Sequence, residues 1–111
     1  MRGERERLLD ILEAIERIEK YAAEGKNAFE SDELIQTWIV HHITIIGEAC
    51  RSLSAEFRAR HTNVPWADIV GMRNILVHHY FGIDTEAVWG VVEHDIPDLK
   101  LNIQSILKNI A

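Results

Sequence analysis

The sequence predicts an all-α protein, an up-and-down bundle of four to five helices that forms a single domain over residues 1–111. Apolar residues recur at helical spacing along most of the chain, and no segment has a convincing strand pattern. Hydrophobic residues make up 47% of the chain and charged residues 27%, with only 6 Gly and 2 Pro. This composition is typical of a compact helical domain and argues against a disordered protein.

The first helix is expected to run from Glu4 to about Lys26, and Gly25 is well placed near its end. The glutamates on this helix are expected to form a solvated face. Its core face is marked by apolar side chains at helical spacing: Leu8, Ile11, Leu12, Ile15, Ile18 and Tyr21.

A long second helix is expected to open with Ser31 as its N-cap and to run to about Arg60. Gly47 in its interior costs about 1 kcal/mol relative to Ala, so another element is expected to pack closely against it. The apolar positions of this helix include Leu34, Trp38, Ile45, Ala49, Leu53 and Phe57.

A third helix is expected between Pro65-Trp66 and Gly82. It carries Arg73, Asn74, His78 and Tyr80 within about two helical turns. These side chains supply a permanent positive charge, an amide, an imidazole that titrates near neutrality and a phenol. Together they are the groups needed to handle a phosphate ester.

On a helical wheel this third helix has two apolar strips. The first faces the core, whereas the second contains Val70 and Val77 and is edged by Asn74 and His78. We expect the same helix of a second copy to cover the second strip, which predicts a homodimer. Arg73 and His78 lie about 140° apart on an ideal helix, so a tight site would require residues from two symmetry-related helices.

After Gly82, Asp84 or Thr85 is expected to cap a helix that runs to about Asp95. Pro97 is expected to impose a break or kink before the last amphipathic segment, because it lacks a backbone N–H and restricts the residue before it. The apolar positions of that segment are Leu99, Ile103, Ile106, Leu107 and Ile110.

The pattern R-x4-H-x-Y, formed here by Arg73, His78 and Tyr80, resembles the signature of the HEPN superfamily, specifically its HepT-like branch. The segments 46–54, 65–74 and 88–97 are also similar to that branch. The resemblance therefore covers nearly the whole chain, and agreement of separated segments in order is more specific than an isolated Arg-x4-His.

The resemblance implies a metal-independent endoribonuclease, the toxin of a prokaryotic toxin–antitoxin pair of type II or type VII kind, with its active site at the homodimer interface. Arg73 would bind the scissile phosphate, His78 would transfer protons, and Asn74 would support them. The implied antitoxin is a minimal nucleotidyltransferase that transfers AMP to Tyr80. ATP and Mg²⁺ would belong to that partner, so this chain is expected to need no cofactor.

A second function remains open on the sequence alone. The net charge of −6 counts against tight, sequence-independent RNA binding, because such binding depends on neutralising phosphates. It favours a non-catalytic binding or scaffolding subunit of a nucleotidyltransferase complex, a role that helical subunits similar to the HEPN superfamily also have. An RNA site would need a local positive cleft, for which the candidates are Arg51, Arg58, Arg60, His61 and Arg73.

Each residue of the motif also has a purely structural alternative. Arg73 could form a surface ion pair, His78 could be a capping imidazole near a helix C-terminus, and Tyr80 could lie at the edge of the core. His79 is expected to be at least half-buried and satisfied by a hydrogen bond. The three tryptophans are scattered at core-like positions, which indicates packing rather than base stacking.

No metal site is expected, because the pairs at 41–42 and 78–79 are adjacent and therefore point about 100° apart on a helix. The single Cys50 excludes an internal disulfide and fits a reducing compartment. The chain has no apolar run of membrane-spanning length and no signal peptide, so a cytoplasmic protein is expected.

Overall fold

The computed structural model describes residues 3–78 and 82–110, and the elements in these two ranges are almost entirely helical. The helices are α1 (Glu4–Ala22), α2 (Lys26–Ser31), α3 (Glu33–Ser52), α4 (Ala55–Arg60), α5 (Trp66–Leu76), α6 (Thr85–Gly90) and α7 (Ile96–Asn109). A π-helical segment, η1 (Val91–Asp95), joins α6 to α7. Two short strands, β1 (Val77–His78) and β2 (Gly82–Ile83), pair antiparallel. The all-α bundle is confirmed.

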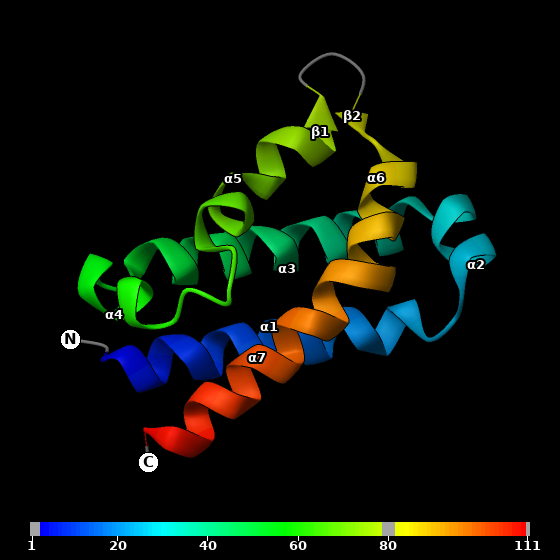
Figure 1. Ribbon diagram of the computed structural model, residues 1–111. Helices are drawn as coiled ribbons and strands as arrows, with labels where there is room; N and C mark the ends of the chain where they lie inside the picture. The colour runs from blue at the N-terminus through cyan, green and yellow to red at the C-terminus, as the bar shows by residue number, and fades with distance from the viewer. Residues whose placement is uncertain (1–2, 79–81, 111) are drawn as a thin grey trace.

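The long helices pack around α3. In Figure 1, α1 lies along one side of α3, α5 contacts α3 and rises away from it, and the continuous run from α6 to α7 returns to α1. An ion pair of 2.9 Å from Lys100 Nζ to Glu19 Oε1 links α7 to α1. β1 and β2 lie at the end of α5 that is farthest from α1 and α7 (Figure 1).

On α1 and α7 the core is formed mainly by the apolar positions that the helical spacing predicts. On α3 it is formed largely by residues that were not predicted, and the predicted Trp38 and Ile45 are only partly buried. Burying each large side chain of the core contributes about 1.5–3 kcal/mol, so these residues account for most of the stability of the bundle. The fully buried side chains include Leu8, Ile11, Ile15 and Ile18 of α1, Phe29 of α2, Ile39, Ile43 and Ile46 of α3, and Ile103 of α7.

The predicted second helix, from the Ser31 cap to about Arg60, is two helices in the structure, α3 and α4, and it begins one residue later than predicted. Ser31 ends α2 rather than capping the next helix, and Asp32 is the N-cap of α3, accepting hydrogen bonds from Leu34 N at 2.9 Å and Ile35 N at 3.4 Å. Leu34 is therefore in the first turn of α3 and is 81% exposed, so this apolar position of the predicted helix does not contribute to the core.

The division between α3 and α4 lies at Leu53, where the backbone is extended with φ −70° and ψ 145°. The Ser54 hydroxyl then accepts a hydrogen bond from Phe57 N at 3.0 Å and begins α4. Phe57 is buried, so the break turns a short helix onto the core instead of continuing α3 into solvent. Hydroxyl side chains compete with the helix for backbone N–H groups, which explains why a helical pattern stops here.

Pro97 does not break the chain into separate helices. The backbone stays helical from Thr85 to Asn109, and the π-helical turns of η1 come directly before α7, in which Pro97 occupies one of the first two positions. Proline lacks a backbone N–H and its ring clashes with the carbonyl four residues earlier, so a helix continues through it only where the hydrogen-bond pattern is irregular, as in the π-helical turns of η1. None of the described helices is both long and apolar enough to cross a membrane.

Candidate active site

The first half of α5 is held closely against α3. A Cβ atom placed on Gly47 would lie 3.4 Å from the carbonyl oxygen of Ile69 and 3.5 Å from that of Val70. The close packing predicted at Gly47 is therefore confirmed, and its neighbour is α5. Val70 is partly buried against the chain's own core, so its predicted exposure for a partner helix is wrong. Val77 lies in β1 rather than on the helix, and the position of its side chain is outside the described part of the structure.

The motif helix ends before the motif does. Helix α5 begins at Trp66, as expected, but it ends at Leu76, and Val77 and His78 form strand β1. The residues at positions 77–81, Val-His-His-Tyr-Phe, are weak helix formers, and Val, Tyr and Phe favour extended structure. The predicted angle of 140° between Arg73 and His78 therefore does not apply, because only Arg73 is on the helix.

The short β-ladder fixes the backbone of His78 at the end of α5. His78 is paired with Gly82, and Asp84 N donates a hydrogen bond of 2.8 Å to Leu76 O where the ladder closes. Gly82 has φ +76°, a left-handed conformation that glycine adopts at little cost. Sequence reasoning missed this ladder, although the glycine after a run of β-branched and aromatic residues was a signal for it.

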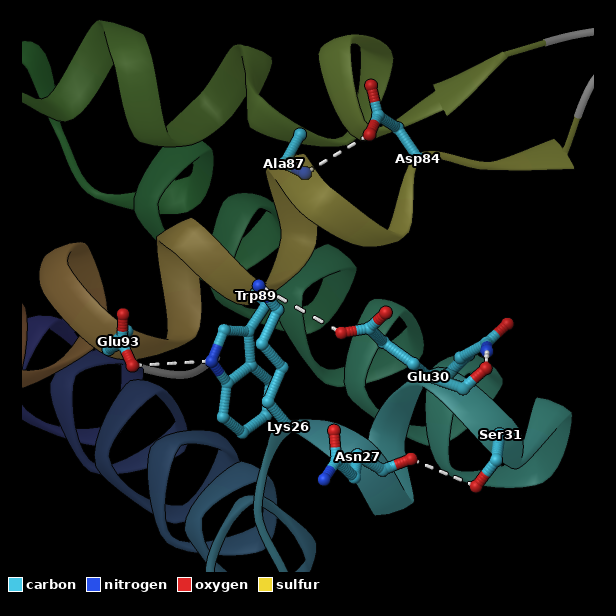
Figure 2. A network of polar contacts seen from close by, with 9 residues as sticks. Lys26, Asn27, Glu30, Ser31, Asp84, Ala87, Trp89 and Glu93 are labelled. Atoms are coloured by element: carbon cyan, nitrogen blue, oxygen red, sulfur yellow. Dashed lines mark hydrogen bonds and ion pairs between the residues drawn. The ribbon is translucent and has the colours of Figure 1, made fainter.

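Asp84 fixes the other side of the ladder to the bundle. Its side chain accepts a hydrogen bond of 3.1 Å from Ala87 N and is the N-cap of α6, the first of the two capping residues predicted (Figure 2). Farther along the same run, Trp89 Nε1 donates a hydrogen bond of 3.3 Å to Glu93 Oε2 (Figure 2). The ladder is thus positioned between two anchored helices.

Arg73 and Asn74 are exposed in the last turn of α5, next to β1. Within the described ranges the Arg73 guanidinium has no ion-pair partner, so the surface ion pair considered for it is not formed there. A positive charge in a last turn is favoured by the helix dipole, and an exposed guanidinium without a partner is available to bind an anion.

The remaining motif residues are only partly described. The backbone of His78 lies in β1, a few residues beyond Arg73, whereas the position of its side chain is outside the described part of the structure. His79 and Tyr80 lie outside the described residues altogether. The catalytic and modification roles of His78 and Tyr80 therefore stay predictions.

The basic residues proposed for a local positive cleft do not gather in one protomer. Arg58 and Arg60 belong to α4, at the opposite end of α5 from the β-ladder (Figure 1). Arg51 is held by Glu48, with a distance of 2.6 Å from Nη2 to Oε2, and the ring of His61 packs 4.6 Å from that of Phe57. Of these candidates, Arg73 alone lies at the ladder.

The other histidines and the tryptophans have structural roles. His42 is buried at 5% exposure, and its Nδ1 is 2.7 Å from the carbonyl oxygen of Trp38, whereas His41 is exposed. The indole N–H groups of Trp38 and Trp66 donate to the backbone carbonyls of Arg17 and His61, at 2.8 and 2.9 Å. The tryptophans are confirmed as packing residues. Where side chains are described, no group of three or more His, Cys, Asp or Glu could hold a metal ion.

Cys50 is not a nucleophile at neutral pH. It is fully buried in α3, and burial raises the pKa of its thiol to about 12, although the positive charge of Arg58 acts in the opposite direction. A protonated thiol is a poor nucleophile, so the chemistry of the chain is expected at the end of α5 rather than in the core.

Comparisons with known proteins identify the family of the chain. A family model described as Ribonuclease HepT-like matches residues 11–106, a range that includes α5 and the β-ladder. A Thermococcus cleftensis protein named probable ribonuclease HepT is 36% identical over 108 residues, which are 96% of this chain and 98% of that protein. A Methanocaldococcus jannaschii protein named "Putative RNase" is 37% identical over 100 residues, 89% of this chain and 92% of that protein. No solved structure matches the chain.

Proposed function

The chain belongs to the ribonuclease HepT-like family, and from this membership we propose that it is a metal-independent endoribonuclease and the toxin of a prokaryotic toxin–antitoxin pair. Ribonuclease activity follows from the family. The observation that supports the position of the site is the exposed Arg73 without an ion pair among the described residues, next to the strand of His78. The family also favours a catalytic subunit over the scaffolding alternative.

In the proposed reaction, the 2′-hydroxyl of RNA attacks the adjacent phosphorus. The bond from O2′ to phosphorus forms, the bond from phosphorus to the leaving O5′ breaks, and a 2′,3′-cyclic phosphate remains. Arg73 neutralises the charge that develops on the phosphoryl oxygens, and Asn74 beside it orients the phosphate. His78 takes the proton of O2′ or gives one to O5′, because an imidazole titrates near neutral pH. No step of this reaction requires a metal ion.

We propose that the complete site contains residues from two copies of the chain. Of the arginines considered for a positive cleft, one protomer offers only Arg73 at the β-ladder, because Arg58 and Arg60 are at the other end of α5 and Arg51 is paired with Glu48. A two-fold axis near the ladder would bring two Arg73 guanidinium groups together and create a positive cleft in a chain of net charge −6.

Mixing two inactive variants tests this arrangement. Arg73→Ala and His78→Ala are each expected to lack activity as homodimers. If Arg73 of one copy works with His78 of the other, a randomly exchanged mixture has one intact site in each heterodimer and recovers about a quarter of the wild-type activity. Complete lack of recovery, with subunit exchange verified by differently tagged chains, would exclude a site shared in this way.

From the same family membership we propose that a partner protein regulates the ribonuclease activity. A minimal nucleotidyltransferase antitoxin would transfer AMP from ATP to the phenol oxygen of Tyr80 and release pyrophosphate, with Mg²⁺ bound to the partner. The added phosphate, close in sequence to Arg73 and His78, would repel the RNA backbone. Tyr80→Phe is expected to remain toxic and to resist silencing. If the wild-type chain is neutralised while mass spectrometry shows an unmodified Tyr80 peptide, the partner acts by binding alone.

A further inference from the structure

An open apolar groove runs between α5 and the helical run from α6 to α7. It has a volume of about 600 Å³, and its floor is formed by Ile43 and Ile46 of α3. Met72 and Leu76 of α5 line one wall, and Leu99 of α7 lines the other. At its edge, Leu101 is 67% exposed, an unusual position for a large apolar side chain next to an apolar surface.

The rim of the groove is acidic. Asp68 of α5, Asp95 of η1 and Asp98 of α7 all line it, and all three are exposed. None of these carboxylates has an ion-pair partner within residues 3–78 and 82–110, although charged residues on α1 and α3 do form pairs. The three carboxylates surround an apolar floor, and no side chain in the described part of the chain neutralises their charge.

This charge distribution selects the class of ligand. RNA is disfavoured, because its phosphates would lie against the three carboxylates. A second copy docked by a two-fold axis through this groove is also disfavoured, because each acidic rim would face the other. We propose that the groove binds an amphipathic helical segment of another protein, apolar on the face that enters the groove and flanked by Lys or Arg residues that meet the rim.

The dimensions of the groove fit such a segment. A helix bound in a groove inserts side chains from successive turns on one face, and the volume of the groove is in the range that binds several apolar side chains. The residues that line it on α5, from Asp68 to Leu76, extend over about two helical turns, which matches that spacing. Met72 precedes Arg73 in sequence, so a bound segment would lie beside the candidate active site while leaving the exposed Arg73 face of α5 uncovered.

A displayed library of helical peptides of about 14 residues tests the proposal without assuming a partner. The library carries apolar residues on one face and Lys, Gln or Glu at random on the flanks, and it is selected on the folded full chain. We expect the selected peptides to carry Lys at the flanking positions. Enrichment of Glu, or equal use of the three residues, would overturn the charge argument.

Binding of the selected peptide to variants then locates the site. The triple variant Asp68→Asn, Asp95→Asn, Asp98→Asn is expected to weaken binding about tenfold at low salt. A control with the same change of net charge, Glu16→Gln, Glu24→Gln, Glu33→Gln, alters exposed carboxylates elsewhere and is expected to change binding less than about twofold. Equal losses in the two triple variants would mean that the peptide responds only to net charge, and the groove would be rejected.

The exposed leucines distinguish a partner from a second copy. Leu101→Asp is expected to abolish peptide binding and to leave the sedimentation of the chain unchanged, whereas Leu34→Asp, at another exposed leucine, is expected to change neither. Dissociation of a homodimer by Leu101→Asp would show that a second copy occupies the groove and would overturn the proposal. None of these measurements depends on ribonuclease activity, so the proposal can fail while the proposed function stands.

Discussion

Arg73 is the residue whose environment is best explained by function. An exposed arginine near a helix end contributes little to folding, since surface substitutions away from caps and networks change stability by about 0.5 kcal/mol or less. Its side chain has no ion-pair partner in the described ranges, whereas the exposed Arg51 of α3 is paired with Glu48. Binding of a phosphate would satisfy the charge that folding leaves free.

Replacement of Arg73 should therefore reduce RNA cleavage without reducing the stability of the fold. Arg73→Ala is expected to lower the rate of RNA cleavage by about 100-fold or more, because it removes the group that compensates transition-state charge. The melting temperature is expected to stay close to that of the wild type. Arg60→Ala, an exposed arginine on α4, is the matched control and should cleave normally. Similar losses in both variants would indicate diffuse electrostatic binding instead of a specific site.

Cys50 makes stability depend on pH in the alkaline range. Its thiol has a pKa of about 12 in the folded chain against 9.0 for the unperturbed group, because burial disfavours the thiolate. The folded state therefore retains a proton that the unfolded state loses above pH 9.0. The stability contribution is complete below that pH and decreases by about 1.4 kcal/mol per pH unit above it, until the folded thiol also ionises.

The comparison with Cys50→Ala isolates this effect. Urea unfolding of the wild type between pH 9.0 and about 12 is expected to show a steeper loss of stability than the variant, which lacks the thiol but keeps all other titrating groups. Identical slopes for the two proteins would mean that the buried thiol ionises as easily as an exposed one.

At the scale of elements, the β-ladder determines where His78 is held. Gly82 pairs with His78 and has φ +76°, a conformation that costs a residue with a Cβ about 1–2 kcal/mol. Gly82→Ala is thus expected to open the ladder, to lower stability by about 1 kcal/mol and to reduce cleavage by displacing His78.

Gly90 provides the control for this substitution. It has helical angles of φ −58° and ψ −42°, and a Cβ there would meet no atom within 4 Å. Gly90→Ala is expected to stabilise the chain by about 0.4–1 kcal/mol and to leave cleavage unchanged. Thermal unfolding and cleavage rates of the two variants test the ladder directly, and full activity of Gly82→Ala would contradict its role.

The contact between α3 and α5 sets the position of the whole motif. Gly47→Ala should be tolerated, because its Cβ would make ordinary contacts at 3.4 and 3.5 Å with two carbonyl oxygens of α5. Gly47→Leu is expected to push α5 away, with a loss of stability of about 1–3 kcal/mol typical of overpacking. Circular dichroism during urea unfolding measures both effects, and equal stability of the two variants would show that α5 is not tightly held.

Core positions could be predicted from the sequence where apolar residues recur at helical spacing, as Ile11, Ile15 and Ile18 do on α1. The ends of the helices could not be predicted, because they depend on which side chain bonds to the free backbone N–H groups. Asp32 rather than Ser31 caps α3, and Ser54 begins a new helix. Arg73 was identified by its motif. The ladder at His78 was missed because strands of two residues give almost no pattern, so that the glycine at position 82 was the main signal for it. The acidic groove was missed because its walls come from separate segments.

In the molecule as a whole, the buried core lies apart from the proposed active site at the end of α5. The start of α1 and the end of α7 lie on the side away from the β-ladder (Figure 1), and the ion pair between Lys100 and Glu19 holds those two helices together. The groove lined by Asp68, Asp95 and Asp98 repels RNA from one side of α5. RNA is therefore expected to approach Arg73 from the other side, where two copies of the chain would meet.

Cleavage of a labelled RNA by the purified chain in excess EDTA distinguishes a metal-independent ribonuclease from a metal-dependent one. The wild type is expected to cut the RNA and to leave 2′,3′-cyclic phosphate ends, and His78→Ala purified in parallel is expected to leave the RNA intact at the same helicity. Cleavage that appears only after a divalent metal is added, or that persists unchanged in His78→Ala, would contradict a metal-independent ribonuclease built on Arg73 and His78.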